Sequence, residues 1–144
     1  MRVDPGVVAV TYRENKNAER EYLLLKRNKG WTGWEMPKGH LEFGSHTATV
    51  FLELNEEAGI EPVEIKDIED LDRYLAWQFT QDGKEVVSNF RCFRVELAED
   101  AEPTLDKNPF DEHEEARFVS REKALEILEY DDQKELLRKE TGKN

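Results

Sequence analysis

The sequence contains little cysteine and no long apolar run. Cys92 is the single cysteine among 144 residues, which excludes an intramolecular disulfide framework and is typical of a reducing, cytoplasmic location. No segment approaches the roughly 18 consecutive apolar residues that a membrane-spanning helix needs. The short apolar run at residues 7–10 follows Asp4 and Pro5 and does not resemble a signal peptide. We therefore expect a cytoplasmic protein without a membrane span.

Basic residues are also scarce relative to acidic ones. The 21 Lys and Arg residues against 33 Asp and Glu residues give a formal net charge of −12. This excess disfavours binding to DNA or to an anionic membrane surface. A polyanionic ligand would need local neutralisation, for which a divalent cation is the obvious candidate. The length is that of one globular domain, which we expect to span residues 1–144.

Hydrophobic patterning predicts several strands and at least two helices. Strands are expected at residues 7–13, 21–27, 61–66, 71–80, 84–97 and 116–119. A helix is expected at residues 46–58, with Ser45 as its N-cap and Gly59 as its stop. Ala124, Leu125 and Leu128 keep helical spacing, and a final helix is expected at residues 132–139. This mixture predicts an α/β fold in which helices cover one sheet.

The expected helix at residues 46–58 carries three glutamates on one face. Glu53, Glu56 and Glu57 are spaced i, i+3 and i+4, so they lie within an arc of roughly 100°. Their charges repel each other and crowd the C-terminal half of the helix, where the macrodipole disfavours anions. A hard divalent ion such as Mg²⁺ would reverse this penalty. From the spacing alone, a solvated acidic face remains the alternative.

A long segment rich in glycine and tryptophan precedes this helix. It spans residues 28–44, and connections of that length are usually functional. Within it, Gly39 allows the backbone to approach a ligand closely. Lys38 and His40 flank this glycine with cationic or hydrogen-bonding groups. These residues are suited to holding phosphate beside an acidic metal-binding face.

Residues 36–60 resemble the Nudix box, whose pattern is Gly, five residues, Glu, seven residues, then Arg-Glu-apolar-any-Glu-Glu-any-Gly-apolar. Residues 34–40, Trp-Glu-Met-Pro-Lys-Gly-His, look most like the branch of asymmetrical diadenosine tetraphosphate hydrolases. The resemblance implies a Nudix-type α/β/α sandwich, with a mixed sheet, a central carboxylate-bearing helix and a C-terminal helix. It also implies Mg²⁺-dependent (or Mn²⁺-dependent) hydrolysis of a phosphoanhydride in a nucleoside diphosphate-linked compound, with a dinucleoside polyphosphate as the first expectation.

Other substrates of the same family remain alternatives to the dinucleoside polyphosphate. They are an oxidised nucleoside triphosphate, a nucleotide sugar and a capped RNA end. A catalytically silent nucleotide-binding module is a further alternative.

The resemblance also implies roles for individual residues. Glu53, Glu56 and Glu57 would bind the metal together with the carbonyl of Gly39. Lys38 and His40 would contact phosphates.

The general base is open between Glu57 and Glu112. Glu112 stands before His113, and the pair resembles the Glu-His of a late loop in the same branch. It would also be a metal ligand, and a solvated loop acid is its alternative. His113 could be a phosphate donor or a turn residue, and Arg27 could face phosphate or be a surface charge at a strand end.

Two departures from the family pattern concern one ion pair, which in the family connects the loop to the helix. From Gly39 to Gly59 is 20 positions, where the pattern has 21, and the gap removes the family's first Glu. Leu52 stands where the family has Arg. In the family these two residues commonly form an ion pair between loop and helix. Loss of both partners can be nearly neutral, so we expect a changed brace with the metal-binding face intact.

Base binding needs an aromatic face or an apolar slot. The candidates are Trp31, Trp34, Tyr74, Trp77, Phe79, Phe90 and Phe93. Most of them are expected in the core because strand residues alternate inward. Cys92 or Phe93 stands where the branch commonly has a stacking Tyr, which argues against a preference for adenine. His46 is expected at the surface.

Overall fold

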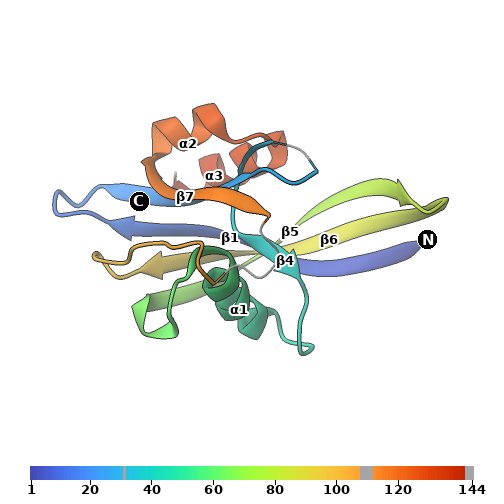
Figure 1. Cartoon of the computed structure of the whole chain (residues 1–144), viewed down its shortest axis with the longest axis horizontal. Helices are drawn as coiled ribbons and strands as arrows, with labels where there is room; N and C mark the ends of the chain where they lie inside the picture. The colour runs from blue at the N-terminus through green and yellow to red at the C-terminus, as the bar shows by residue number, and fades with distance from the viewer. Residues whose placement is uncertain (31, 108–111, 142–144) are drawn as a thin grey trace.

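A mixed sheet forms the centre of the molecule in the computed structural model, which describes residues 1–30, 32–107 and 112–141. The strand β1 (Arg2–Glu14) runs parallel to β6 (Lys84–Leu97), and β5 (Ile65–Gln81) pairs antiparallel with β6 at the edge. At one end the β5–β6 hairpin and the start of β1 project together beyond the helices (Figure 1). Valine, phenylalanine and tyrosine are frequent in these strands, as expected for residues that pack on a pleated surface.

The other edge of β1 pairs with two different strands in succession. Gly6, Val7 and Val8 pair with β4 (Lys38–His40), and further along β1 residues 12–14 pair with β2 (Arg20–Arg27). Between these two ladders the Ala9 amide donates a hydrogen bond to the Pro37 carbonyl at 2.9 Å. The sheet therefore forks along β1.

The β2 branch of this fork carries two further strands. They are β3 (Gly33–Glu35) and β7 (His113–Ser120), both antiparallel to β2.

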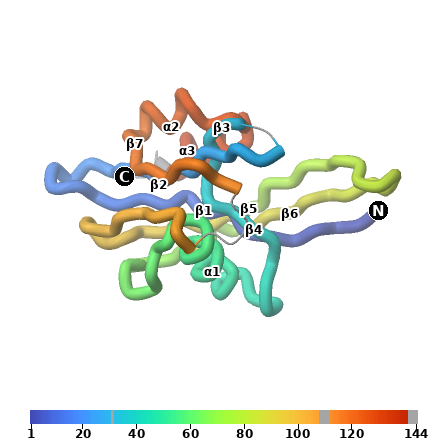
Figure 2. The backbone as a smooth tube through the Cα atoms, viewed as in Figure 1, coloured from blue at the N-terminus to red at the C-terminus, as the bar shows by residue number. Residues whose placement is uncertain are grey.

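Helices cover both faces of the sheet. The helix α1 (His46–Ala58) lies on one side, and α2 (Arg121–Ile127) and α3 (Asp131–Thr141) lie on the other (Figures 1 and 2). Alternate β1 residues face the two layers: Val7 and Ala9 pack in the cluster with Leu54 of α1, whereas Val8 and Val10 pack with α3. This arrangement confirms the predicted α/β/α sandwich.

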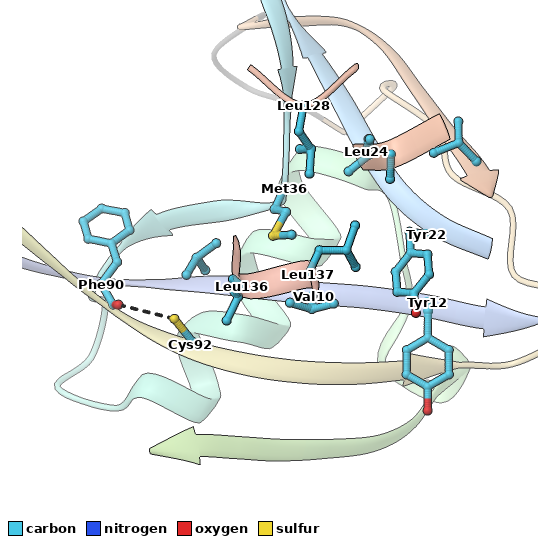
Figure 3. Packing of buried hydrophobic residues seen from close by; sticks show 13 residues of the cluster. Val10, Tyr12, Tyr22, Leu24, Met36, Phe90, Cys92, Leu128, Leu136 and Leu137 are labelled. Atoms are coloured by element: carbon cyan, nitrogen blue, oxygen red, sulfur yellow. Dashed lines mark hydrogen bonds between the residues drawn. The ribbon is translucent and has the colours of Figure 1, made fainter. Parts of the chain in front are cut away.

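The C-terminal helix α3 contributes side chains to the cluster that includes Val8 and Val10. Leu136 and Leu137 of α3 lie over Val10, beside Met36 and Leu24 (Figure 3). The side chain of Gln133 also accepts a hydrogen bond from the Met36 amide at 2.8 Å. The helix α3 is thus attached to the segment between β3 and β4, which precedes the candidate site.

The carboxylate-bearing helix α1 has the predicted limits and caps. The Ser45 hydroxyl accepts a hydrogen bond from the Ala48 amide at 3.1 Å. Gly59 adopts a left-handed conformation (φ 67°), and its amide bonds to the Asn55 carbonyl. These two caps satisfy backbone groups that the helix leaves open at its ends.

Three secondary-structure predictions need correction. The strand expected at residues 61–66 begins only at Ile65, the first residue of β5. The residues before it form a 3₁₀ turn, η1 (Pro62–Glu64), because Pro62 favours the first helical position and Glu61 and Glu64 form a capping box. The strand expected at residues 71–80 is part of β5, whose pairing is irregular between Asp70 and Tyr74. The segment 28–44, expected as a loop, contains β3 and β4.

None of the helices within the described ranges is long and apolar enough to span a bilayer.

Candidate active site

One cleft contains every residue that the sequence analysis placed in the site. It has a volume of about 1010 Å³, at the upper end of the range usual for ligand pockets. The predicted residues that line it are Arg27, Lys38, Gly39, His40, Glu53, Glu56, Glu57 and Glu112. Both branches of the forked sheet and the helix α1 therefore contribute walls.

Glu53 lies directly against the backbone of Gly39. A Cβ atom placed on Gly39 would collide with the Glu53 carboxylate, so any other residue at position 39 would push this carboxylate away from the backbone of β4. Burial raises the pKa of Glu53 to about 8, and the neighbouring charges of Glu56, Glu42 and Glu112 add to the shift. This carboxyl is therefore unstable as an anion unless a cation compensates it.

Glu57 is the most enclosed glutamate of the helix, with 9% of its surface exposed. Its carboxylate accepts a hydrogen bond from the Lys38 amide at 3.1 Å. Burial raises its pKa well above the ordinary value, and repulsion from Glu53 and Glu35 acts in the same direction. Two adjacent carboxyls with raised pKa, both reaching one cleft, have the hard oxygen donors that a divalent cation prefers.

Glu112 reaches the same place from the segment before β7. One ligand atom from each of Glu57, Glu112 and His113 lies within 4.8 Å of the other two. The Glu112 carboxylate forms an ion pair with the Nη1 of Arg27 at 3.2 Å. The structure thus brings the two candidate bases, Glu57 and Glu112, together, although they are far apart in the sequence.

Two cations face these carboxylates. Arg27 stands at the end of β2, where its Nε also donates to the Lys29 carbonyl at 2.9 Å. The Nζ of Lys38 lies 5.1 Å from the ring centre of Trp77 and 5.6 Å from that of Tyr130. The cleft therefore combines an acidic wall on α1 with positive charges on β2 and β4, which is the arrangement that a metal-bound polyphosphate requires.

Glu35 is a buried residue of the cleft that the sequence analysis missed. Its side chain is 1% exposed, and its Oε2 lies 2.7 Å from the Nε2 of His113. His113 is buried within β7, so the alternative that it is a turn residue is wrong. A charged residue inside the otherwise apolar stretch from Trp34 to Pro37 is a signal that the sequence did offer, because a buried charge requires partners.

Three of the predicted aromatic candidates line the cleft. Trp77, Phe79 and Phe90 line the cleft, and the ring centres of Trp77 and Phe90 are 4.9 Å apart. Tyr130 and Phe43 also line it and were not predicted.

The remaining aromatic candidates lie elsewhere, apart from Trp31, which falls outside the described residues. Phe93 is buried in the hydrophobic cluster that includes α1, and Cys92 is buried in the other cluster, which includes α3. Tyr74 contacts Arg91, and Trp34 packs against the cluster with α3 under Arg117. His46, in the first turn of α1, is not among the residues that line the cleft.

A threonine braces the loop that the shortened motif leaves between β4 and α1. The Thr49 hydroxyl, which is buried, accepts a hydrogen bond from the Glu42 amide at 2.8 Å. It is also within hydrogen-bonding distance of the Ser45 carbonyl (2.7 Å) and the Glu42 carbonyl (3.1 Å), to which it can donate. Leu52 lines the cleft at the position of the family's Arg. The Thr49 hydroxyl therefore ties this loop to the first turns of α1, and the changed brace at the two family positions stays a prediction.

Comparisons with known proteins agree with the fold described above. The sequence model of the NUDIX domain matches residues 3–139. Among solved structures, an Ap4A hydrolase of C. elegans in a binary complex is similar with a TM-score of 0.75 and 24% identity, covering 96% of both chains.

Two other solved structures share the fold at lower identity. The dihydroneopterin triphosphate pyrophosphohydrolase of E. coli has a TM-score of 0.72 and 15% identity, covering 96% of this chain and 97% of the other. The NUDIX domain of Shewanella oneidensis NrtR, complexed with ADP ribose, has a TM-score of 0.73 and 16% identity, covering 99% and 88%. No curated protein sequence matches the chain.

Proposed function

The chain belongs to the NUDIX domain family of pyrophosphohydrolases, which act on acid anhydrides, and from that premise we propose that it cleaves a dinucleoside polyphosphate with Mg²⁺. The observation that carries this proposal is the cleft itself. The α1 carboxylates and the cations Lys38 and Arg27 line one space that is large enough for a nucleotide. The match of the NUDIX domain model to residues 3–139 confirms the family resemblance seen in the sequence, and the substrate is our proposal.

The residues present fit a divalent cation. Glu53 and Glu57 repel each other and have raised pKa values, and the Glu53 carboxylate lies directly against the backbone of Gly39. We assign Glu53, Glu56 and Glu57 as ligands, with the Gly39 carbonyl and Glu112 completing the set. When bound, the ion would lower the pKa of a water molecule and neutralise phosphate charge.

The remaining steps belong to side chains of the chain. Lys38, His40 and Arg27 hold the phosphates, since each presents a cationic or donor group to the cleft. A carboxylate accepts the proton of the attacking water, and this base is either Glu57 or Glu112. The water oxygen forms the new bond to phosphorus while the anhydride P–O bond breaks and the released phosphate takes the electron pair.

The choice of a dinucleoside polyphosphate has three supports. The residues Trp34–His40 look like the diadenosine tetraphosphate hydrolase branch, and the fold is similar to a C. elegans Ap4A hydrolase. The aromatic side chains Trp77, Phe79 and Tyr130 line the same cleft, and an exposed aromatic ring can offer an apolar face to a base.

Replacement of Glu57 by glutamine tests the function. Glu57→Gln keeps the size of the side chain and should lower Mg²⁺-dependent release of mononucleotides by about a hundredfold or more, the usual contribution of a general base, while the protein still melts cooperatively. Glu114→Gln is the matched control, because Glu114 pairs with Lys26 outside the residues that line the cleft. The substrates are diadenosine tetraphosphate, a nucleotide sugar, an oxidised nucleoside triphosphate and a capped RNA.

Each result decides between named alternatives. A near-normal rate for Glu57→Gln would contradict the assignment of Glu57. Faster turnover of another compound in the set would replace the dinucleoside polyphosphate as substrate. Nucleotide binding by calorimetry without turnover at millimolar Mg²⁺ or Mn²⁺ would instead identify a catalytically silent binding module.

A further inference from the structure

We propose that Glu35 is a positioning residue, whose buried charge holds Lys38 and Arg27 in place to receive the phosphates of the substrate. The inference rests on the proposed function, because it assumes that these two cations bind phosphate. Glu35 lies at the end of β3, where it pairs with Leu25 of β2, and it lines the floor of the cleft.

The two carboxylate oxygens of Glu35 face different partners. The Oε2 lies 2.7 Å from His113 Nε2 and 3.7 Å from Arg27 Nη1. The Oε1 lies 3.5 Å from Lys38 Nζ and has no hydrogen-bond partner among the described residues. One carboxylate thus lies between a cation from β2 and a cation from β4, the two branches of the forked sheet.

The burial of Glu35 makes these contacts stronger than surface ion pairs. The side chain is 1% exposed, whereas those of Arg27 and Lys38 are 24% and 20% exposed. A carboxylate out of water is costly unless charges or hydrogen bonds compensate it, and here two cations and one histidine do so. Lys38 Nζ and Arg27 Nη1 lie 3.5 and 3.7 Å from the carboxylate oxygens of Glu35, so the attraction is one of charge rather than of short hydrogen bonds. This attraction restrains the two cations while they line the cleft.

The same carboxylate also connects the cations to the acidic residues. His113, which is bonded to Glu35, directly follows Glu112, and the Lys38 amide donates to Glu57. Loss of the Glu35 charge would leave two neighbouring cations to repel each other. We expect the effect on kcat rather than on substrate binding, because attraction of a polyanion tolerates a small displacement and transition-state stabilisation does not.

The first measurement uses Glu35→Gln, which removes the charge and keeps a polar partner for His113. We expect kcat for Mg²⁺-dependent hydrolysis to fall about tenfold or more, with KM changed by less than about threefold. Glu114→Gln, with the same loss of charge beside Lys26, should leave both constants at the wild-type value. An unchanged kcat for Glu35→Gln would overturn the inference.

A double-mutant cycle separates positioning from a general loss of structure. Lys38→Met removes one of the two cations, and the additional effect of Glu35→Gln should be much smaller in that background. Equal effects of Glu35→Gln with and without Lys38 would assign Glu35 a structural role only and would overturn the inference.

Glu35→Asp covers the case in which Glu35→Gln does not fold. It keeps the buried charge but withdraws it by one methylene from both cations. A reduced kcat in a folded Glu35→Asp protein supports the inference, and a wild-type kcat overturns it. Failure of the proposed function is recognised separately, because the wild type would then show no Mg²⁺-dependent turnover, or Glu57→Gln would keep a near-normal rate, whatever the result at Glu35.

Discussion

Thr49 stands buried beneath the loop between β4 and α1, and its hydroxyl bonds to the Glu42 amide. Thr49→Val keeps the shape of the side chain but leaves that amide without its acceptor. We expect the free energy of unfolding, measured with urea, to fall by about 1–3 kcal/mol.

Thr49→Ser retains the hydroxyl and serves as the control for the loss of the hydrogen bond. It should be clearly more stable than Thr49→Val. Equal stability of the valine and serine variants would show that the hydroxyl does not brace the loop.

Site residues that are close in the sequence were predictable, and those joined only by the fold were not. Lys38, Gly39 and the three glutamates of α1 follow from local spacing. Glu35 and His113 are 78 positions apart, and their contact depends on β3 and β7 both pairing with β2. Tyr130 precedes α3 without any local pattern that points to the cleft.

At the scale of the element, α1 places two carboxyls with raised pKa side by side. The pKa of Glu53 is about 8 in the folded protein, against 4.5 as the ordinary value. The folded state therefore retains a proton that the unfolded chain releases as the pH rises from 4.5 to 8. The contribution of Glu53 to the free energy of unfolding therefore decreases as the pH rises from 4.5 to 8.

The corresponding prediction compares the metal-free wild type with Glu53→Gln, which cannot titrate at this position. Between pH 5 and pH 8 the melting temperature of the wild type should fall relative to that of the variant. Addition of Mg²⁺ at pH 8 should stabilise the wild type more than Glu53→Gln, because the ion requires the deprotonated carboxylate. A constant difference between the two proteins across this pH range would contradict the raised pKa.

Whole elements were predictable where their ends carry local signals. The helix α1 has Ser45 and Gly59 as caps, and the hairpin between β5 and β6 has Asp82 and Gly83 at its turn. The short strands β3 and β4 were not predicted, because three residues form a strand only when a neighbouring strand offers its hydrogen bonds.

On the scale of the whole molecule, the sheet joins two hydrophobic clusters on opposite faces. Leu54 of α1 and Leu137 of α3 are each fully buried, one in each cluster. Replacement of either by alanine should lower the free energy of unfolding by about 2–5 kcal/mol. Because both clusters depend on the same strands, each variant should still unfold in a single transition seen equally by near- and far-ultraviolet circular dichroism.

The double variant Leu54→Ala/Leu137→Ala provides the control. Its loss should equal the sum of the single losses within about 0.5 kcal/mol, since the two side chains belong to different clusters on opposite faces of the sheet. Two separate transitions would contradict our expectation of one domain over residues 1–144.

The fork along β1 also fixes the width of the cleft. Residues 6–8 of β1 pair with β4, and residues 12–14 pair with β2. The length of the segment 9–11 therefore sets how far apart β4 and β2 lie along β1. Each residue of an extended strand adds about 3.3 Å, which is more than the tolerance of a catalytic contact. Insertion of one residue in the segment 9–11 would displace Lys38 relative to Arg27. It would also turn the β1 side chains after the insertion to the opposite face of the sheet. The length of β1 thus determines the distance between Lys38 and Arg27, although none of the described residues that line the cleft belongs to β1.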